Sequence, residues 1–566
     1  MNRTRSLACV LLVACSLSYA ASPRPAHARS GMVVAADPLA ARVGEKILEE
    51  GGNAVDAAVA TGFALAVTYP GAGNLGGGGF MVIRFADGRT AALDYREKAP
   101  LSATRTMYLD SSGAVVPEKS TEGHLASGVP GSVAGMLEAL SRYGTMKPAR
   151  VIAPSITLAR EGFVVTEELS RSMRQMIPVF RKFPASMASF TNNGAPYREG
   201  DRLKQPALAR TLRSIAAQGR DGFYRGWVAE RIVQEMKQGG GLITHADLES
   251  YTPVWRNALA GSYRGYDVIS MPPPSSGGVA LLQLLNMLEP DDLRSFGWNS
   301  AKTVHLMAES MRRVYADRAE YLGDPDFYPV PEEELISKKY AETRRATIDS
   351  LHASSSDRVS HGRIVVGHES EETTHYSVID KDGNCVSVTT TLNGSYGSGV
   401  TVTGAGFLLN NEMDDFSAKP GTPNMYGLIG NEANAIAPGK RMLSSMTPTI
   451  LVKDNKPFMV VGSPGGSTII TTVLQTIVNV VDFGMNISEA VNAPRIHHQW
   501  RPDVIMYERF ALSSDTIEKL RAMGHHLEER RGMQGLVEGI LLKQTEEGRR
   551  VEGASDARGY GAASGY

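Results

Sequence analysis

The chain has 566 residues, of which 42% are hydrophobic and 21% charged, a composition typical of a folded globular protein rather than a disordered or fibrous one. Its 59 Lys and Arg residues are balanced by 60 Asp and Glu residues, for a net charge of −1. This balance excludes the broad positive field with which a protein attracts nucleic acid or an anionic membrane surface. The length allows several domains or one large composite domain.

The N-terminus has the pattern of a bacterial export signal. Two arginines precede an apolar run over 7–17, and small residues at positions 20, 21, 26 and 28 offer cleavage sites. The run is shorter than the roughly 20 residues that a membrane span needs. We predict an export signal over 1–28 and a periplasmic or secreted mature protein without a stable membrane span. Cys15 follows Leu12-Val13-Ala14, so a lipid anchor at Cys15 is an alternative.

A glycine cluster over 71–79 follows two expected helices, 40–48 and 54–67, and precedes an expected strand over 80–85. The cluster contains G-x-G-x-x-G, but a dinucleotide-binding fold places that motif between a strand and a helix. Here the order is helix, glycines, strand. We therefore expect a loop whose backbone packs closely against another part of the protein.

The middle of the chain divides into two regions. Residues 123–287 are expected to be mostly helical, and a further helix is expected over 279–288. Residues 341–372 are polar and lack apolar periodicity, as in Ser354-Ser355-Ser356 and Glu369-Ser370-Glu371-Glu372. These features are typical of an exposed, mobile connector.

Two alternating segments after this connector, 373–380 and 385–392, predict a hairpin around Lys381-Asp382-Gly383-Asn384. Cleavage before Thr373 would place a hydroxyl nucleophile and a free α-amino group on one residue. An α-amino group, with a pKa near ~8, can accept the hydroxyl proton at neutral pH, whereas an internal amide cannot. The pattern therefore suits a self-cleaving hydrolase. His375, on the same strand face as Thr373, is the competing base. Cys385 is expected to be a small buried hydrophobe.

Several longer motifs resemble those of the γ-glutamyltranspeptidase family. They run in order from about Ala36 to the C-terminus and include Asp94-Tyr95-Arg96-Glu97, Tyr315-Ala316-Asp317-Arg318, Thr373-Thr374-His375-Tyr376-Ser377, Leu409-Asn410-Asn411-Glu412-Met413-Asp414-Asp415-Phe416, Leu443-Ser444-Ser445-Met446-Thr447-Pro448-Thr449 and Gly462-Ser463-Pro464-Gly465-Gly466-Ser467. The resemblance implies the N-terminal-nucleophile hydrolase fold, an α+β four-layer αββα sandwich with two stacked antiparallel sheets. It also implies autocatalytic cleavage between Glu372 and Thr373. The resulting large chain (29–372) and small chain (373–566) would form a heterodimer and one composite domain.

The implied activity is transfer of a γ-glutamyl group from glutathione or a related γ-glutamyl amide. The acceptor is water, or an amino acid or peptide, and the intermediate is a γ-glutamyl-threonine ester. Two alternatives stay open: a cephalosporin-type acylase acting on β-lactam side chains on the same fold, and an uncut non-enzymatic binding protein. The presence of Arg96 and Asp415, which would bind the two charged groups of a γ-glutamyl substrate, favours γ-glutamyl transfer over the acylase.

The resemblance assigns roles that the residue types can fill. Thr373 is the nucleophile, and the hydroxyl of Thr391 bonds to it. A cationic fork at Arg96, with Ser444 and Ser445, suits the substrate α-carboxylate. Asp415, helped by Glu412 and Asn393, suits the α-ammonium group. The plainer alternatives are a surface ion pair of Arg96 with Glu97 or Asp94 and a capping role for Asp415.

Two further features complete the expected site. A strand over 458–461 and a helix over 468–481 place Gly465 and Gly466 at a turn, where backbone N–H groups can face an oxyanion; the alternative is a turn chosen for geometry alone. Tyr426, in a Gly- and Pro-rich stretch between Lys419 and Arg441, resembles the covering aromatic of a lid, the alternative being a plain surface loop. His497 and His498 would point to opposite faces of a strand. No metal or cofactor is expected.

Overall fold

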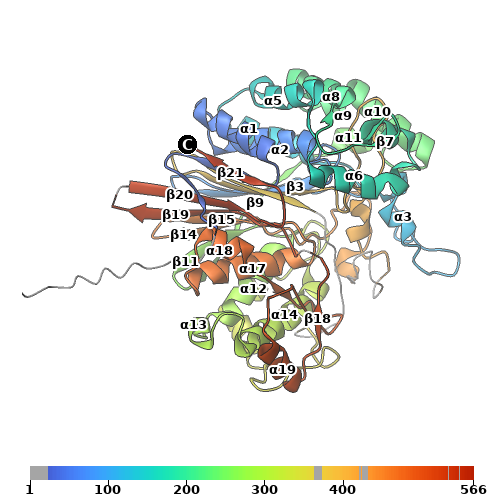
Figure 1. Cartoon of the computed structure of the whole chain (residues 1–566). Helices are drawn as coiled ribbons and strands as arrows, with labels where there is room; N and C mark the ends of the chain where they lie inside the picture. Colours follow the sequence, from blue (N-terminus) through green and yellow to red (C-terminus); the bar gives the residue numbers. More distant parts are fainter. Residues whose placement is uncertain (1–22, 362–372, 420–421, 423–430, 533, 547) are drawn as a thin grey trace, which may run out of the picture.

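Two antiparallel β-sheets, packed face to face, form the centre of the protein (Figure 1). The computed structural model describes residues 23–361, 373–419, 422, 431–532, 534–546 and 548–566. Within these residues each of the two sheets has seven strands. One layer of helices covers the outer face of each sheet, so the architecture is the predicted four-layer αββα sandwich.

The first sheet has the order β21-β2-β12-β13-β3-β4-β9. Its strands are β2 (Met32–Ala35), β3 (Gly78–Arg84), β4 (Thr90–Asp94), β9 (Val254–Arg256), β12 (Thr374–Ile379), β13 (Cys385–Thr391) and β21 (Ala562–Gly565). The second sheet has the order β1-β20-β19-β15-β14-β11-β10. Its strands are β1 (Ala26–Ala28), β10 (Leu259–Tyr263), β11 (Tyr266–Ser270), β14 (Thr449–Lys453), β15 (Lys456–Val461), β19 (Glu538–Thr545) and β20 (Gly548–Ser555).

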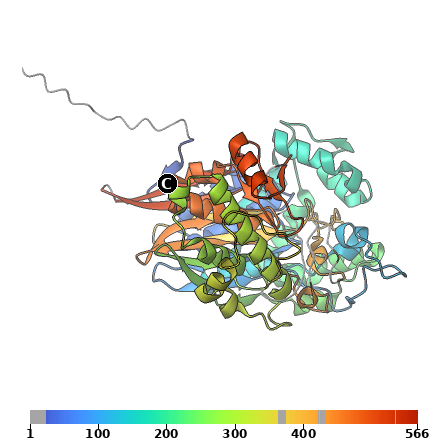
Figure 2. The same ribbon diagram turned by 90° about the horizontal axis from the view of Figure 1, so that it is seen from below.

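Helices from the first half of the chain cover the first sheet, and helices from the middle and the C-terminal part cover the second (Figure 1). The first layer contains α1 (Pro38–Glu49), α2 (Ala54–Thr68), α4 (Ser132–Tyr143), α5 (Pro148–Glu161) and α8 (Pro206–Gln218). The second contains α12 (Gly277–Leu288), α14 (Ala301–Tyr321), α17 (Thr468–Val481) and α18 (Ile487–Asn492). Seen from below, the green helices α12 and α14 lie in front (Figure 2).

Shorter elements complete the chain. The helices are α3 (Glu118–Thr121), α6 (Glu167–Phe180), α7 (Pro184–Phe190), α9 (Asp221–Tyr224), α10 (Gly226–Gly239), α11 (His245–Ser250), α13 (Leu293–Phe296), α15 (Glu332–Leu335), α16 (Lys338–Arg345) and α19 (Ser514–Ala522), with 3-10 turns at His124–Ala126, Glu412–Asp415 and Glu432–Asn434. The strands are β5 (Phe163–Val164), β6 (Thr191–Asn192), β7 (Ala195–Pro196), β8 (Arg202–Leu203), β16 (Ile496–His497), β17 (Ile505–Tyr507) and β18 (Leu527–Glu529).

One hydrophobic core lies between the first sheet and its helices, and a second fills the space between the two sheets and extends to the helices of the second layer. Every residue of α2 is buried, because the helix lies between the first sheet and α5. A capping box between Asn53 and Asp56 starts this helix, satisfying N–H groups that the first turn leaves without helical partners. Cys385 is buried in β13, and burial raises the pKa of its thiol to about 12, which confirms the expected hydrophobic role.

The expectation that 123–287 is mostly helical is wrong for residues 254–270. β9, β10 and β11 lie there, and β10 and β11 form a hairpin around Arg264 and Gly265, both with positive φ. β11 is held from its other side by β14, almost two hundred residues further along the chain. The local sequence pattern does not reveal a strand partner that is so distant in sequence.

In the described part of the expected connector, 341–361, most residues are exposed, as expected, but several are held in place by hydrogen bonds. Arg344 in α16 is buried and donates to the carbonyl oxygens of Arg313 and Ser360. The indole Nε1 of Trp500 donates to the carbonyl oxygens of Ser356 and Val359, each at 2.9 Å. Hydrogen bonds, and not apolar packing alone, hold this segment. Its sequence therefore needs no apolar periodicity. Residues 362–372 lie outside the described residues.

The predicted export signal also lies mostly outside the described residues. Its last part includes β1, which pairs with β20 through Ala26 and Gly553. Cleavage after Ala28 would remove this strand, whereas cleavage after Ala20 would keep it. Among the described residues no helix is long and apolar enough to cross a membrane.

Candidate active site

Thr373 lies directly before β12, in the middle of the first sheet. β12 pairs on one side with β2 and on the other with β13, where Thr374 lies opposite Thr390. The predicted hairpin is therefore confirmed, and it brings the ends of its two strands together. Thr373 at one end and Thr391 at the other both face one small cavity. The expected hydrogen bond between their hydroxyls stays a prediction.

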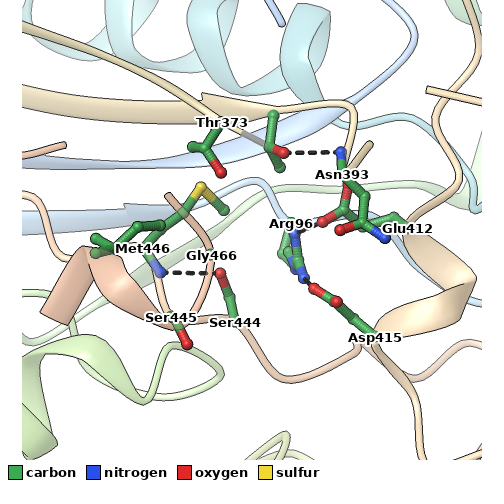
Figure 3. A pocket seen from close by; sticks show the side chains of 11 residues that line it. Arg96, Thr373, Asn393, Glu412, Asp415, Ser444, Ser445, Met446 and Gly466 are labelled. Carbon is green, nitrogen blue, oxygen red and sulfur yellow. Dashed lines mark hydrogen bonds and ion pairs between the residues drawn. The ribbon is translucent and has the colours of Figure 1, made fainter. Parts of the chain in front are cut away.

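This cavity collects most of the residues that the sequence singled out (Figure 3). It encloses about 240 Å³ between atoms, its open mouth included. The predicted residues in its wall are Arg96, Thr373, Thr391, Asn393, Glu412, Asp415, Ser444, Ser445 and Gly466. Met446 and Ile469 also line it; sequence reasoning missed both, because apolar wall residues carry no chemical signature. Glu372 and Tyr426 lie outside the described residues.

Arg96 forms the charged end of the cavity (Figure 3). It follows β4, and its backbone N–H donates to Asp94 Oδ1 at 3.0 Å. Its side chain is buried and forms ion pairs with Glu412 and Asp415. It also donates to the carbonyl oxygens of Met442 and Leu443. An ordinary surface ion pair is thus excluded.

Three carboxyl groups surround this single guanidinium group. Glu97 lies 3.6 Å from Arg96 Nη1, beside Glu412 and Asp415. Burial raises the pKa of Glu97 to about 7 and that of Glu412 well above its ordinary value, although the Arg96 charge opposes both shifts. Burial also raises the pKa of Asp415. Because one positive charge cannot balance three buried carboxylates, this end of the cavity favours a proton or an additional cation.

Ser444 and Ser445 form another part of the cavity wall and are held by residues from earlier in the sequence. The carbonyl oxygen of Ser444 accepts a hydrogen bond from the N–H of Ser276 at 2.6 Å. Arg318, on α14, donates to the hydroxyl oxygens of Ser276 at 2.8 Å and Ser445 at 3.1 Å. The hydroxyl of Ser444 accepts from the N–H of Met446 at 3.2 Å (Figure 3). These contacts fix both hydroxyls at the cavity.

The predicted turn between β15 and α17 holds Gly465 and Gly466, with φ of 131° and 55°. Both values lie where side chains are disfavoured. Gly466 lines the cavity, whereas Gly465 is not among its lining residues. Gly466 is therefore the better placed of the two to face a developing oxyanion.

The histidines near the site are buried and lack acidic partners that would favour their charged forms, with one exception. His375 contacts the hydroxyls of Thr389 at 2.9 Å and Ser377 at 3.1 Å. His497 contacts Thr471 and Gln499, while His498 lies 3.3 Å from Asp503. The two neighbours thus contact different partners. Among the described residues no group of three or more His, Cys, Asp or Glu side chains is arranged to hold a metal ion.

Two stacked sheets between helical layers, with a threonine at the head of a central strand beside a buried charged pocket, define an amidohydrolase of the N-terminal-nucleophile class. The chain belongs to the γ-glutamyltranspeptidase family, because the family described as "Gamma-glutamyltranspeptidase" matches residues 40–566. It is 51% identical over 535 residues to the "Glutathione hydrolase proenzyme" of Escherichia coli (strain K12), covering 94% of this chain and 91% of the relative.

More distant similarity extends to acylases. The chain is 40% identical to the "Acylase ACY 1 proenzyme" of Pseudomonas sp. (strain SE83), covering 90% of this chain and 89% of the relative. Among solved structures, a cephalosporin acylase from Bacillus halodurans superposes with a TM-score of 0.85 at 28% identity, covering 98% of this chain and 99% of that chain. The γ-glutamyltranspeptidase of Helicobacter pylori matches at 50% identity with a TM-score of 0.57, covering 57% and 93%.

The predicted family, fold and enzyme class are thereby confirmed. The chain is a γ-glutamyltransferase of the N-terminal-nucleophile type, and the alternative of a non-enzymatic binding protein is set aside.

Proposed function

We propose that the precursor cuts itself between Glu372 and Thr373, and that Thr373 then carries the γ-glutamyl group of glutathione or a related γ-glutamyl amide. The observation that carries this proposal is the single cavity shared by Thr373, Arg96 and Gly466. A nucleophile, a charged recognition group and a backbone donor are the three parts that acyl transfer from a zwitterionic substrate requires.

Maturation begins when the hydroxyl of Thr373 attacks the carbonyl carbon of Glu372. The peptide C–N bond breaks, an ester forms, and the former amide nitrogen becomes the α-amino group of Thr373. Water hydrolyses the ester and leaves Glu372 as the C-terminus of the large chain. The products are a large chain ending at Glu372 and a small chain of residues 373–566. Relatives named proenzymes support such processing.

Catalysis then uses the new α-amino group. It accepts the proton of the Thr373 hydroxyl while the oxygen attacks the substrate γ-carbonyl. The N–H of Gly466, in the turn set by Gly465, stabilises the oxyanion. The departing amine takes the proton, and a γ-glutamyl-threonine ester remains. Water or an acceptor amine, from an amino acid or peptide, attacks this ester and regenerates Thr373. Thr391 orients the nucleophile.

Recognition uses the charged end of the cavity. Arg96 with Ser444 and Ser445 binds the α-carboxylate, and Asp415, helped by Glu412 and Asn393, binds the α-ammonium group. Oε2 of Glu412 and Oδ1 of Asp415 are buried oxygen atoms without a hydrogen-bond partner within the described residues. An ammonium group supplies the donors and the positive charge that these atoms lack.

The remaining parts of the proposal concern place and access. The export signal over 1–28 would direct the precursor to the periplasm or beyond, with Cys15 as the alternative lipid anchor. Tyr426 would cover the bound substrate as part of a lid. The mature enzyme would be a heterodimer of the large and small chains.

Thr373→Ala tests the proposed nucleophile. We expect the variant to remain one uncut chain without activity on a γ-glutamyl anilide, because the attacking oxygen is absent. Intact mass of the wild type should show a small chain that begins at Thr373. A variant that still yields two chains, with the small chain beginning at Thr374, would contradict the assignment.

Arg96→Ala and Arg96→Lys test substrate recognition and separate γ-glutamyl transfer from acylase activity. We expect Arg96→Ala mainly to raise KM, with a loss of about 2 to 5 kcal/mol in the free energy given by kcat/KM, as for a desolvated charge pair. Lysine should restore little, because a point charge cannot replace the guanidinium fork. Steady-state kinetics with a γ-glutamyl anilide and with a β-lactam side-chain amide lacking the α-carboxylate provide the measurement. An unchanged KM in Arg96→Ala would remove Arg96 from the site.

A further inference from the structure

The glycine-rich loop over 71–79 packs directly against the backbone that carries the active site, as the order helix, glycines, strand predicted. A methyl group on Gly77 would overlap the carbonyl oxygen of Thr391. One on Gly76 would overlap the carbonyl oxygen of Leu408. The loop therefore touches two of the chain segments that supply the cavity wall, one before Asn393 and one before Glu412.

Asn74 is the side chain in this loop with the most bonds. It is buried, and its Nδ2 lies 2.8 Å from the carbonyl oxygen of Thr391, 2.9 Å from that of Ala72 and 3.2 Å from Thr390 Oγ1. Its Oδ1 accepts from the N–H of Gly77 at 3.0 Å and from the hydroxyl of Ser132 at 2.6 Å. Both halves of the amide are thus engaged.

The bond from Asn74 to Thr391 fixes the last residue of β13. Immediately beyond it, the N–H of Asn393 donates to the hydroxyl oxygen of Thr391 at 2.8 Å, and Asn393 has a positive φ of 69°. The Thr391 hydroxyl can then orient only as this short turn allows. Because Thr373 faces the same cavity from the neighbouring strand, a shift of Thr391 changes the surroundings of the nucleophile.

A second buried amide, Asn410, makes a similar set of hydrogen bonds next to Glu412, where the substrate is proposed to bind. Its Nδ2 donates to the carbonyl oxygens of Gly76 and Gly128, both at 2.8 Å. Its Oδ1 accepts from the N–H of Gly128 at 2.8 Å and from that of Glu412 at 3.0 Å. Asn410 thus ties the same loop to the residue that pairs with Arg96.

We propose that Asn74 is a positioning residue for the acyl-transfer chemistry, and that the glycine-rich loop divides its support between the two halves of the site. Asn74 holds the Thr391 side, where bonds are made and broken, and Asn410 holds the Glu412 side, where the substrate is bound. This inference rests on the proposed function, because it takes Thr373 as the nucleophile. It predicts that the two amides affect different kinetic constants.

The test compares Asn74→Ala and Asn410→Ala, with rates expressed per cut small chain on a denaturing gel. We expect Asn74→Ala to lower kcat by about tenfold to a hundredfold, as small displacements of reacting groups do, with KM within twofold of wild type. Asn410→Ala should raise KM by a larger factor than it lowers kcat. Self-cleavage should also slow in Asn74→Ala, because it uses the same hydroxyl.

Ser132→Ala keeps the test decisive should Asn74→Ala not fold. It removes the hydroxyl that donates to Asn74 Oδ1 while leaving the loop backbone intact, and we expect kcat to fall at least threefold with KM unchanged. Ser186→Ala is the matched control, since Ser186 is equally buried and its hydroxyl donates at 2.6 Å to the carbonyl oxygen of Gly399, away from the cavity.

The outcomes separate this inference from the proposed function. An unchanged kcat in Ser132→Ala and in any folded Asn74→Ala, or an equal loss in Ser186→Ala, would overturn the positioning role. A cut, active Thr373→Ala measured in the same series would instead overturn the proposed nucleophile. An inactive Thr373→Ala together with a selective kcat loss in Ser132→Ala supports both.

Discussion

His375 lies two residues after the proposed nucleophile, yet its surroundings favour a neutral ring. Both ring nitrogens contact hydroxyl groups, of Thr389 and Ser377. Burial lowers the pKa of His375 to about 3, so the ring stays uncharged above about pH 4 and changes charge only in strong acid. A histidine in this state cannot produce an acidic limb near neutral pH.

Other groups can titrate near neutrality, among them the α-amino group of Thr373 that cleavage would free and the carboxyl of Glu97, whose pKa burial raises to about 7. We expect the acidic limb of kcat to persist in both His375→Asn and Glu97→Gln, because the free amine must lose its proton, ordinarily with a pKa of ~7.7 to 8.0, to act as base. The measurement is the pH profile of kcat in fully cut protein. Loss of the limb in His375→Asn would make the histidine the base, and loss in Glu97→Gln would assign it to that carboxyl.

At the scale of single residues, the sequence predicted which chemically distinctive residues share the site, but not which of them form ion pairs with one another. Charged and hydroxyl side chains stand out in motifs, so nine of the predicted residues are found in one cavity wall. The ion pairs of Arg96 with Glu412 and Asp415 join segments more than three hundred residues apart. Gly466 lines the cavity and Gly465 does not. This difference depends on the backbone angles of the turn, which the residue types do not specify.

At the scale of elements, local pattern succeeded where an element is stabilised by its neighbours in sequence. The hairpin of β12 and β13 has its own turn, and α17 is an apolar run after glycines, so both follow from the sequence. β10 and β11 and the segment 346–361 depend on partners elsewhere. Ser356 of that segment accepts hydrogen bonds from the buried side chains of Arg312 and Trp500. The polarity of the segment does not reveal these partners.

Trp500→Phe tests how that segment is held. The change removes the indole donor to Ser356 and Val359, at a cost of about 1 to 3 kcal/mol for carbonyl groups left without a partner. In the uncut Thr373→Ala background, we expect trypsin to cut after the exposed Arg358 roughly 5 to 100 times faster, because cleavage requires local opening. Mass spectrometry of timed digests measures the rate.

Trp298→Phe is the matched control for this experiment. Its indole also donates one hydrogen bond, to Asn479 Oδ1 at 3.0 Å, but it does not contact the segment 346–361 through that bond. Equal acceleration in both variants would indicate general destabilisation instead of a specific clamp on the segment.

At the scale of the whole molecule, cleavage would leave two chains that both contribute strands to each of the two sheets. In the first sheet, β2 of the large chain lies between β21 and β12 of the small chain, and β13 of the small chain pairs with β3 of the large chain. In the second sheet, the small chain's β14 pairs with the large chain's β11. The two chains therefore share hydrogen-bonded strand pairs in both sheets, and separating the chains must break these pairs.

We therefore expect the cut chains to remain together until the fold itself is lost. On gel filtration the mature enzyme should elute as one species containing both chains, at high dilution and in 1 M NaCl alike, because salt screens exposed charges but leaves buried strand pairing intact. In a urea titration, separation of the chains should coincide with loss of the β-sheet circular dichroism signal. The uncut Thr373→Ala variant, with the same ladders in one chain, should lose that signal at a similar or higher urea concentration, since its chain cannot separate. Chains that separate at urea concentrations where the β signal is still complete would contradict the interleaved arrangement.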